Sequence, residues 1–438
     1  MSDTPLSVGI LPLGCKVSQY ECEAIGESFE REGFVLRPFS EVCDVYIINT
    51  CTVTAESDHK SRKAIRRAIK KNPEALVMVS GCYSQTSPSE VAKIEGVGAV
   101  IGNHDKMSLS RIARDILCGK QTKPYISTTN IDEAPFEPMC ITRAPRTRAY
   151  VKIEDGCECR CSYCAIPGAR GRVRSKAPED VIREVEALAA RGTAEVVLTG
   201  IETASYGADF DNGYRLIDLL EALDRRRSCR RIRLGSLSPE GMREDFVKRL
   251  SALSIVVPHF HLSMQSGSDG VLRGMRRRYS RDMALAALSR LRESIPDVQF
   301  TTDMMVGFPG EGEREFLETL DFVKQARFLD MHVFAYSQRK NTPAATYPDQ
   351  VSEEEKHRRS AILIAEKNRI RDEILDGLVA KGTPLSAVVE TVRGGTATAH
   401  ADNFAELRFA ASGCLHGEVR LVRPLSHADG VIYGEIIK

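Results

Sequence analysis

Apolar and polar positions alternate in blocks along the first part of the chain, where short apolar runs are separated by amphipathic stretches. Four of these runs predict strands: residues 7–13, 45–49, 76–80 and 97–101. Strand patterns that alternate with helical ones are typical of βαβ units. The first domain is therefore predicted to be an open parallel α/β sheet over residues 5–118.

A second alternating block follows an irregular, proline-rich stretch that we interpret as a linker over residues 119–142. Six apolar segments predict strands: residues 149–153, 195–198, 231–234, 259–263, 298–305 and 331–336. Five stretches with apolar residues at three- and four-residue spacing predict helices between them: residues 177–191, 216–225, 240–252, 281–294 and 313–326. Six strands are too few for a closed eight-fold barrel, so residues 143–378 are predicted to form a partial (β/α)6 barrel with its ligands at the carboxyl ends of the strands.

The C-terminal part of the chain changes pattern twice. Residues 352–378 predict one long charged helix, and residues 379–438 are β-branched and punctuated by glycine, which predicts a small β domain. From Lys381 onward six basic residues balance six acidic ones. Charge therefore does not identify this domain as an RNA-binding one.

Overall charge and cysteine content narrow the class of protein. The 438 residues carry 61 Lys and Arg against 60 Asp and Glu, a formal charge of +1, so a nucleic-acid partner must be met by local basic patches. Thirteen cysteines occur without a charged-then-apolar leader or an apolar run long enough to cross a bilayer. We expect a cytoplasmic protein without a membrane partner, whose clustered cysteines bind metal or act in redox chemistry.

The spacing Cys157-x-x-x-Cys161-x-x-Cys164 gives three thiolates in one loop just past the first strand of the central domain. A four-iron cluster normally takes four cysteines, so three leave one iron for an exchangeable ligand. Cys159 allows a second interpretation, because with it the loop offers four thiolates for a closed zinc site. Zinc sites of that kind more often consist of two spaced pairs, which favours the cluster.

Three further cysteines follow predicted strands of the first domain: Cys15, Cys51 and Cys82. The carboxyl ends of parallel strands form the ligand-binding edge of a sheet, so we expect these thiols to lie close together as a second three-cysteine site. Glycines precede Cys15 and Cys82, and they let the backbone turn tightly and approach a bulky inorganic ligand.

Motifs along essentially the whole chain resemble the methylthiotransferases of the radical S-adenosylmethionine (SAM) superfamily. The resemblance rests on Leu-Gly-Cys15-Lys-Val, Asn-Thr-Cys51-Thr-Val-Thr, Ser-Gly-Cys82-Tyr-Ser-Gln, the Cys157 loop, Pro167-Gly-Ala-Arg-Gly-Arg-Val-Arg-Ser175, and later blocks at residues 199–207, 265–269, 303–311 and 332–337. The segment from Gly14 to Glu21 is most similar to the branch that modifies N6-threonylcarbamoyladenosine (t6A) beside the anticodon of tRNA. Ser18 stands where this family usually has Asn, and Glu202 where Asn or His is common; both departures bear on substrate choice.

The resemblance implies a fold, cofactors and site residues. The fold is α/β, with an open sheet domain, a radical SAM partial barrel and a C-terminal β-barrel similar to a TRAM domain. The cofactors are SAM and two [4Fe-4S] clusters, the first held by Cys157, Cys161 and Cys164 and the second, which carries the sulfur to be donated, by Cys15, Cys51 and Cys82. The radical chemistry then belongs to the cofactors and to no catalytic side chain. The expected contacts of SAM are Tyr163, Gly200, Ile201 and Gly310.

The implied activity is conversion of t6A in tRNA to 2-methylthio-t6A, with electrons from a donor such as flavodoxin and with no DNA partner. Two alternatives stay open. A sister branch modifies an aspartate of a ribosomal protein by the same chemistry. A protein of a different class, a non-enzymatic RNA-binding protein stapled by zinc, would use the same cysteines for structure alone.

Basic residues gather in three places that predict contacts with RNA phosphates. The run from Lys60 to Lys71 has seven basic residues and no acidic one beside a separate apolar face, although a solvated helix face explains such a run equally well. Arg pairs bidentately with phosphate, so arginine clusters on strand-end loops favour RNA over a protein substrate. The candidate residues are Arg170, Arg172, Arg174 and Lys176 near the Cys157 loop, and Arg277 and Arg278 further along.

Overall fold

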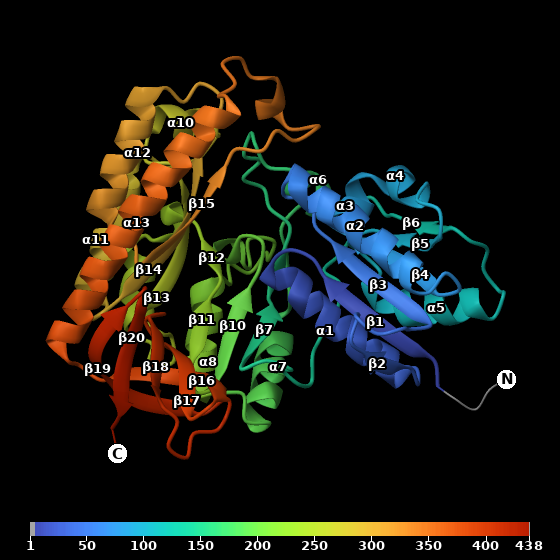
Figure 1. Ribbon diagram of the computed structural model, residues 1–438, viewed down its shortest axis with the longest axis horizontal. Helices are drawn as coiled ribbons and strands as arrows, with labels where there is room; N and C mark the ends of the chain where they lie inside the picture. Colours follow the sequence, from blue (N-terminus) through green and yellow to red (C-terminus); the bar gives the residue numbers. More distant parts are fainter. Residues whose placement is uncertain (1–4, 438) are drawn as a thin grey trace. The chain divides into compact units, whose positions relative to one another are not determined.

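A computed structural model of the protein describes residues 5–437, which form two compact units (Figure 1). The first unit consists of residues 5–141, 150–176 and 337–345. The second unit consists of residues 142–149, 177–336 and 346–437. Both three-cysteine motifs lie in the first unit.

A six-stranded parallel sheet forms the centre of the first unit, in the order β2-β1-β3-β4-β5-β6. Its strands are β1 (Ser7–Pro12), β2 (Val35–Arg37), β3 (Val45–Thr50), β4 (Leu76–Gly81), β5 (Val97–Ile101) and β6 (Tyr125–Ser127). The predicted parallel sheet is confirmed, with two short edge strands added. The linker interpretation is wrong for residues 125–127, because β6 pairs with β5 there.

Helices cover both faces of this sheet because side chains of a strand alternate between them. Val45 and Ile47 of β3 pack in one core with α1 (Lys16–Arg31) and α5 (Leu109–Leu117). Tyr46 and Ile48 pack in the opposite core with α2 (Ala55–Lys71) and the short helices α3 (Cys82–Thr86) and α4 (Pro88–Ala92). A 3-10 turn, η1 (Lys106–Ser108), leads into α5. The result is a three-layered α/β/α unit.

The surface shows how the edge strands differ from the central ones. Central strands β3 and β4 are buried throughout, whereas Val35 of β2 is 41% exposed and Ile126 of β6 is 49% exposed.

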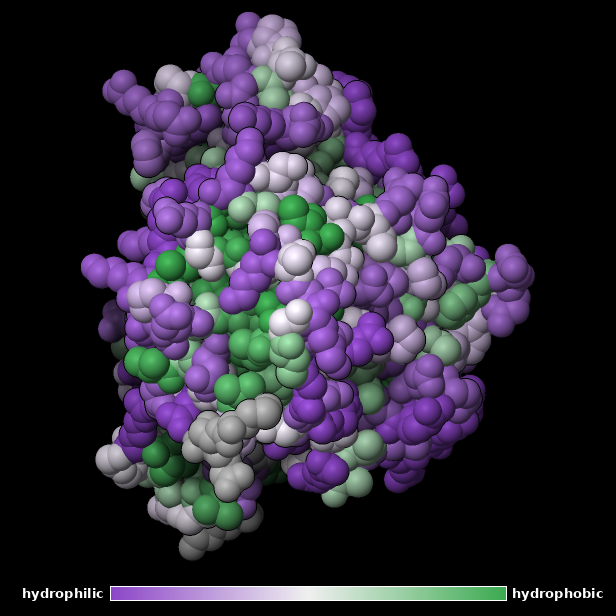
Figure 2. All heavy atoms as spheres, turned by 90° about the vertical axis from the view of Figure 1, so that its right-hand side faces the viewer, coloured by the Kyte–Doolittle hydropathy of each residue, from purple (hydrophilic) through white to green (hydrophobic). Residues whose placement is uncertain are grey.

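The face seen in Figure 2 is mostly hydrophilic, with apolar residues gathered near its middle. Within residues 5–437, no helix has both the length and the apolar character that a membrane crossing requires.

The segment that carries the second cysteine motif is built on a small hairpin. Strand β7 (Arg148–Lys152) begins in the second unit and continues into the first. It is followed by β8 (Glu154–Asp155), the cysteine loop, the short helix α6 (Ile166–Arg170) and β9 (Arg174–Ser175). Strands β8 and β9 pair antiparallel and close the base of the loop.

Parallel strands of the second unit follow one another in chain order, as predicted for a partial barrel. They are β10 (Glu195–Thr199), β11 (Ile232–Leu234), β12 (Ser236–Leu237), β13 (His259–Gln265), β14 (Gln299–Val306) and β15 (Asp330–Ala335). One sheet has the order β11-β10-β7 and the next β12-β13-β14-β15; only Gly235 separates β11 from β12, so the chain passes directly from one sheet to the other.

Helices connect these strands as the apolar spacing predicted: α7 (Pro178–Ala190), α8 (Leu216–Arg226), α9 (Glu244–Ser251), α11 (Arg281–Ser294) and α12 (Glu313–Ala326). The structure adds α10 (Asp269–Gly274) and the 3-10 turns η2 (Thr203–Ser205), η3 (Pro239–Gly241) and η4 (Pro343–Thr346). The third predicted helix starts later than expected, because Pro239 begins η3 and α9 follows only at Glu244.

The C-terminal region contains the predicted long helix, α13 (Glu353–Lys381), and a closed five-stranded barrel in the order β16-β17-β18-β20-β19. The barrel strands are β16 (Leu385–Arg393), β17 (Thr396–Ala401), β18 (Glu406–Ala410), β19 (Val419–Ala428) and β20 (Val431–Ile436). Leu375 and Leu378 of α13 join the apolar core of the barrel. The helix therefore anchors the barrel to the rest of the second unit.

Candidate cysteine cluster site

The first three-cysteine site lies at the carboxyl edge of the parallel sheet. Cys51 directly follows β3, Cys82 directly follows β4, and Cys15 lies three residues beyond β1. These three strands are neighbours, and the strand order reverses direction between β1 and β3. Ligands of open α/β sheets bind at such a switch point, outside the carboxyl ends of the strands.

Two glycines allow the three loops to approach one another. Gly14 has φ +112°, and a Cβ there would stand 3.0 Å from Cβ and 3.1 Å from Sγ of Cys51. Gly81 has φ +98°, and a Cβ there would stand 2.4 Å from the backbone oxygen of Thr50. A side chain at either position would push the neighbouring loop away and would strain the backbone. The tight turns predicted at these two glycines are confirmed, and their approach to an inorganic ligand stays a prediction.

The thiols of this site influence one another electrostatically. Desolvation raises the pKa of Cys15, which is nonetheless exposed at the surface, and that of Cys51. The negative charge of a Cys82 thiolate raises both pKa values further, whereas Arg170 lowers that of Cys15. Asn103 Nδ2 lies 3.4 Å from Cys82 Sγ and donates to the Ala169 carbonyl at 2.7 Å. A bound metal centre would supply the positive charge that stabilises these three side chains as thiolates.

The Cys157 loop is shaped by its own backbone contacts. The Cys157 N–H donates to the Gly171 carbonyl at 3.0 Å, and the Cys164 N–H to the Cys161 carbonyl at 3.1 Å. Gly156 has φ +89°, and a Cβ there would stand 1.8 Å from the Arg172 carbonyl oxygen. Only glycine fits this position, so the loop closes tightly with Cys157 at its start.

The two cysteine motifs differ in their donors from an ordinary structural zinc site. Zinc requires four ligands at about 2.3 Å from one centre when they are thiolates. Thiolates of a four-iron cluster bind separate irons and stand farther apart. The donor set and the tight glycine turns at both motifs therefore fit iron-sulfur clusters.

Substitution of Cys159 by serine tests which of the loop cysteines are ligands. We expect the variant to keep the visible absorption of the reconstituted cluster and its iron content, because three other thiols complete the motif. Absorption spectra and iron assays of Cys159→Ser beside Cys164→Ser give the comparison. A cluster lost from the first variant and kept by the second would contradict the ligand assignment.

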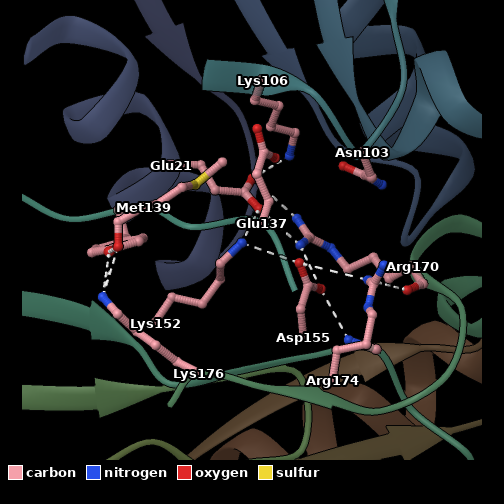
Figure 3. A network of polar contacts seen from close by, with 12 residues as sticks. Glu21, Asn103, Lys106, Glu137, Met139, Lys152, Asp155, Arg170, Arg174 and Lys176 are labelled. Atoms are coloured by element: carbon pink, nitrogen blue, oxygen red, sulfur yellow. Dashed lines mark hydrogen bonds and ion pairs between the residues drawn. The ribbon is translucent and has the colours of Figure 1, made fainter. Parts of the chain in front are cut away.

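A buried network of charges lies behind the two motifs (Figure 3). Arg170 Nη1 donates to Glu21 at 3.0 Å and to Asp155 at 2.9 Å. Lys152 Nζ lies 3.2 Å from Glu21 and 3.1 Å from Asp155, and Lys106 Nζ lies 2.5 Å from Glu21. All five side chains are at most 5% exposed. With two carboxylates and three cations, the network carries one net positive charge.

Electrostatic coupling in this network keeps its carboxylates ionised. Desolvation opposes their ionisation, but Arg170 and the two lysines hold the pKa of Glu21 well below its usual range. Arg170 and Lys152 likewise lower the pKa of Asp155. Arg170 is also within electrostatic reach of Cys15 and Cys82. The network thus links α6, which follows the Cys157 loop, to the strand-end cysteines.

Three of the four arginines and lysines predicted near the loop to contact RNA are buried, which corrects that expectation. Arg170 is 1%, Arg174 8% and Lys176 4% exposed. Arg174 donates to the Arg170 carbonyl at 2.6 Å, and Lys176 to the Met139 carbonyl at 2.7 Å. Their charges are met by protein groups from distant parts of the chain. Only Arg172 is exposed, so it alone stays a candidate from this cluster.

The remaining candidates lie mostly in the second unit. Gly200 and Ile201 directly follow β10, and Tyr163 lies half-buried in the cysteine loop of the first unit. Gly310 has φ +81° and donates its N–H to the Asp349 carbonyl at 3.0 Å, so a turn alone accounts for the glycine. The SAM contacts stay a prediction.

Arg277 and Arg278, the candidates of the second unit for RNA contact, follow α10. Arg277 donates to the Ser263 carbonyl at 3.0 Å, while Arg278 is exposed. RNA contact by these two residues stays a prediction.

Helix α2 presents the basic run as its sequence predicted. Ala64, Ile65 and Ala68 are buried in the sheet core. Most of the basic side chains are exposed: Lys60, Lys63, Arg66, Arg67 and Lys70. Arg62 is different, because it is only half-exposed and its Nη1 donates to the Tyr83 hydroxyl at 3.2 Å.

A cavity of about 850 Å³ opens between the two cysteine motifs. Thr52 and Tyr83 line it, each directly after a cysteine of the strand-end site. Cys164 and Gly168 line it from the second motif. A fourth side comes from residues 338–341, where Arg339 donates to Thr52 Oγ1 at 2.7 Å. A ligand in this cavity would contact Cys164 and would lie beside the residues that follow Cys51 and Cys82.

Comparisons with known proteins agree with this arrangement. The model of the radical SAM superfamily matches residues 151–323, and that of the uncharacterized protein family UPF0004 matches residues 7–102. Threonylcarbamoyladenosine tRNA methylthiotransferase MtaB of Bacillus subtilis (strain 168) is 38% identical over 99% of this chain and 96% of that protein. The protein of the same name from Aquifex aeolicus (strain VF5) is 35% identical, over 88% and 93%.

Relatives with another name are also similar. A tRNA-2-methylthio-N(6)-dimethylallyladenosine synthase from Acidothermus cellulolyticus is 34% identical over 87% of this chain and 78% of that protein. Among solved structures, the radical SAM methyltransferase TsrM from Kitasatospora setae has a TM-score of 0.57 at 16% identity, covering 78% of this chain and 77% of that one. At that identity the likeness concerns the fold alone.

Proposed function

Because this chain belongs to the methylthiotransferase family of the radical SAM superfamily, we propose that it converts t6A beside the anticodon of tRNA to 2-methylthio-t6A. The observation that carries this proposal is the match, along nearly the whole chain, to relatives named for that reaction. Two incomplete cysteine sets beside one cavity support it, since the reaction needs a radical source and a sulfur source.

The cofactors follow from the two cysteine sets. SAM bound to one four-iron cluster supplies a carbon-centred radical when it is reduced, and a second cluster supplies sulfur. Cys157, Cys161 and Cys164 would hold the first cluster through a loop whose ends are fixed by β8 and β9. The second would be held by Cys15, Cys51 and Cys82 at the sheet edge. The protein side chains position these groups; flavodoxin as electron donor and a cytoplasmic setting stay predictions.

The alternatives are less well supported. The relatives quoted above are named for tRNA substrates, which favours tRNA over a ribosomal protein aspartate. The strand-end site offers three cysteines, one fewer than the four ligands of a structural zinc site. Membership of an enzyme family also argues against a purely structural role for both motifs.

Analysis of tRNA nucleosides from cells that lack this protein tests the proposal. We expect 2-methylthio-t6A to disappear and t6A to accumulate by the same amount, because t6A is the substrate and is made without this enzyme. Mass spectrometry of digested total tRNA measures both nucleosides. The wild-type gene supplied in trans should restore the product, whereas an unchanged nucleoside profile together with a ribosomal protein that loses a methylthio group would refute the proposal.

A further inference from the structure

Arg62 is the guanidinium of the cavity wall that has no carboxylate partner. Within residues 5–437 no Asp or Glu oxygen lies within 4.0 Å of its guanidinium nitrogens. Its one hydrogen bond uses Nη1, which donates to the Tyr83 hydroxyl at 3.2 Å. The hydroxyl of Tyr83 in turn donates to Glu90 Oε2 at 3.1 Å, so Tyr83 is fixed from both sides. The Nε and Nη2 edge of Arg62 therefore remains for a two-point contact.

Arg339, the other guanidinium on the cavity wall, is already neutralised. Its Nη2 lies 2.7 Å from Asp58 Oδ2 and donates to Thr52 Oγ1 at 2.7 Å. Thr52 also donates to Asp58 Oδ1 at 2.8 Å. This closed set of contacts leaves Arg339 no need of an anionic ligand. Of the two arginines, Arg62 is the one suited to recognise an anion.

The size and charge of the cavity select the kind of ligand. Its volume of about 850 Å³ lies in the range of pockets that enclose drug-sized molecules, roughly 300–1,000 Å³. A substituted nucleoside with one negative charge is of that size, whereas a phosphate chain would bring several negative charges beside Asp58 and Glu90 on the wall. A single planar carboxylate matches the open edge of one guanidinium. Phosphates of the RNA are better met by exposed side chains elsewhere on α2, such as Lys63 and Arg66.

We propose that this cavity takes the t6A nucleoside and that Arg62 binds the carboxylate of its threonylcarbamoyl group. The inference rests on the proposed function and adds the residue that reads the substrate. Adenosine without the substituent, and adenosine bearing a hydrocarbon substituent, offer no carboxylate and leave Arg62 unpaired beside the cavity. Discrimination among the three follows from one charge-assisted contact.

Exchange of Arg62 for glutamine, combined with removal of the substrate charge, isolates this contact. The probes are anticodon stem-loop RNAs with t6A, with the methyl ester of t6A, or with unmodified adenosine. The wild-type holoenzyme should bind the acid about 10- to 100-fold more tightly than the ester. R62Q should bind acid and ester alike, at the affinity that the wild type shows for the ester. Its iron content and its circular dichroism spectrum should match those of the wild type, which shows that the variant is folded and carries its clusters.

A matched control lies five residues further along α2. Arg67 is exposed on the same helix, so R67Q removes the same charge outside the cavity. It should weaken all three RNAs equally and keep the ratio of acid to ester. The inference is overturned if R62Q still prefers the acid to the ester as strongly as the wild type does. It is also overturned if R62Q loses the same amount of affinity for the acid RNA and the ester RNA. If the wild type forms no 2-methylthio-t6A from the t6A stem-loop, the proposed function itself fails, which is a separate outcome.

Discussion

Exchange of Cys51 for alanine is expected to abolish formation of 2-methylthio-t6A while cleavage of SAM to 5′-deoxyadenosine continues. Cys51 lies between Cys15 and Cys82 in strand order, and its Sγ packs against Gly14. Its loss leaves two thiols, too few for a four-iron cluster. The Cys157 loop is a separate structure with its own backbone contacts, so it should assemble normally.

Three measurements on anaerobically reconstituted protein check whether Cys51→Ala loses product formation and keeps SAM cleavage. Iron and sulfide should fall from about eight of each per chain to about four. Product analysis by mass spectrometry should show no methylthiolated nucleoside, and 5′-deoxyadenosine should stay within about twofold of the wild type. Cys161→Ala should lose both activities. A Cys118→Ala control, at an exposed cysteine after α5, should behave as the wild type.

Two results would contradict a sulfur-donor role for the cysteines at the sheet edge. Product from Cys51→Ala at the wild-type rate would mean that the strand-end thiols are not ligands. An iron content of about four in the wild type would leave room for only one cluster. Either result can be read without knowing the electron donor, because a chemical reductant replaces it.

Much of this architecture is visible in the sequence, because it depends on local patterns. Strands β3 and β4 are buried on both faces, so each begins with four consecutive apolar residues, and a cysteine directly follows each strand. Edge strands β2 and β6 have three residues each and are only partly buried, so they are too short to show an alternation of apolar and polar positions. The parallel topology then brings Cys15, Cys51 and Cys82 to one edge without further information.

The buried charges could not be found in the same way. Glu21 and Lys152 are 131 positions apart in sequence, and nothing local marks either as a partner of the other. Arg170, Arg174 and Lys176 look like a surface patch when charge is counted along the chain. Their burial depends on carboxylates and carbonyls that the fold delivers from other segments. A charged residue on the apolar face of a helix, such as Glu21 on α1, was the one available signal.

Exchange of Glu21 for glutamine is expected to have the largest effect on stability, a loss of about 3–5 kcal/mol of unfolding free energy. Glu21 is the carboxylate that Arg170, Lys152 and Lys106 share. Without its charge, Asp155 alone faces three buried cations, and Lys106 loses its ion-pair partner. An uncompensated buried charge costs far more than the surface pair of Glu32 with Arg114, so Glu32→Gln should cost at most about 1 kcal/mol.

The pH dependence of this loss has a definite sign. The folded-state pKa of Glu21 lies below its usual value near 4, so the native state binds fewer protons than the unfolded chain in acid. Its contribution is therefore complete above about pH 5 and is lost as the pH falls toward the folded pKa. The difference between wild type and Glu21→Gln should be constant from pH 6 to 8, on the order of 3–5 kcal/mol, and shrink below about pH 4.

The chain has two compact units, so the unfolding free energy of the first unit has to be measured by itself. Hydrogen exchange of the amides of α1 and β8, followed as urea is added, gives that free energy. A double variant, Glu21→Gln with Lys106→Met, then separates charge from shape. It removes the stranded cation, and apolar replacement of buried ion pairs is often neutral, so much of the lost stability should return. Equal instability of the single and double variants would mean that Glu21 acts through packing. Recovery would establish that Glu21 stabilises the first unit by balancing the buried charges of Arg170, Lys152 and Lys106.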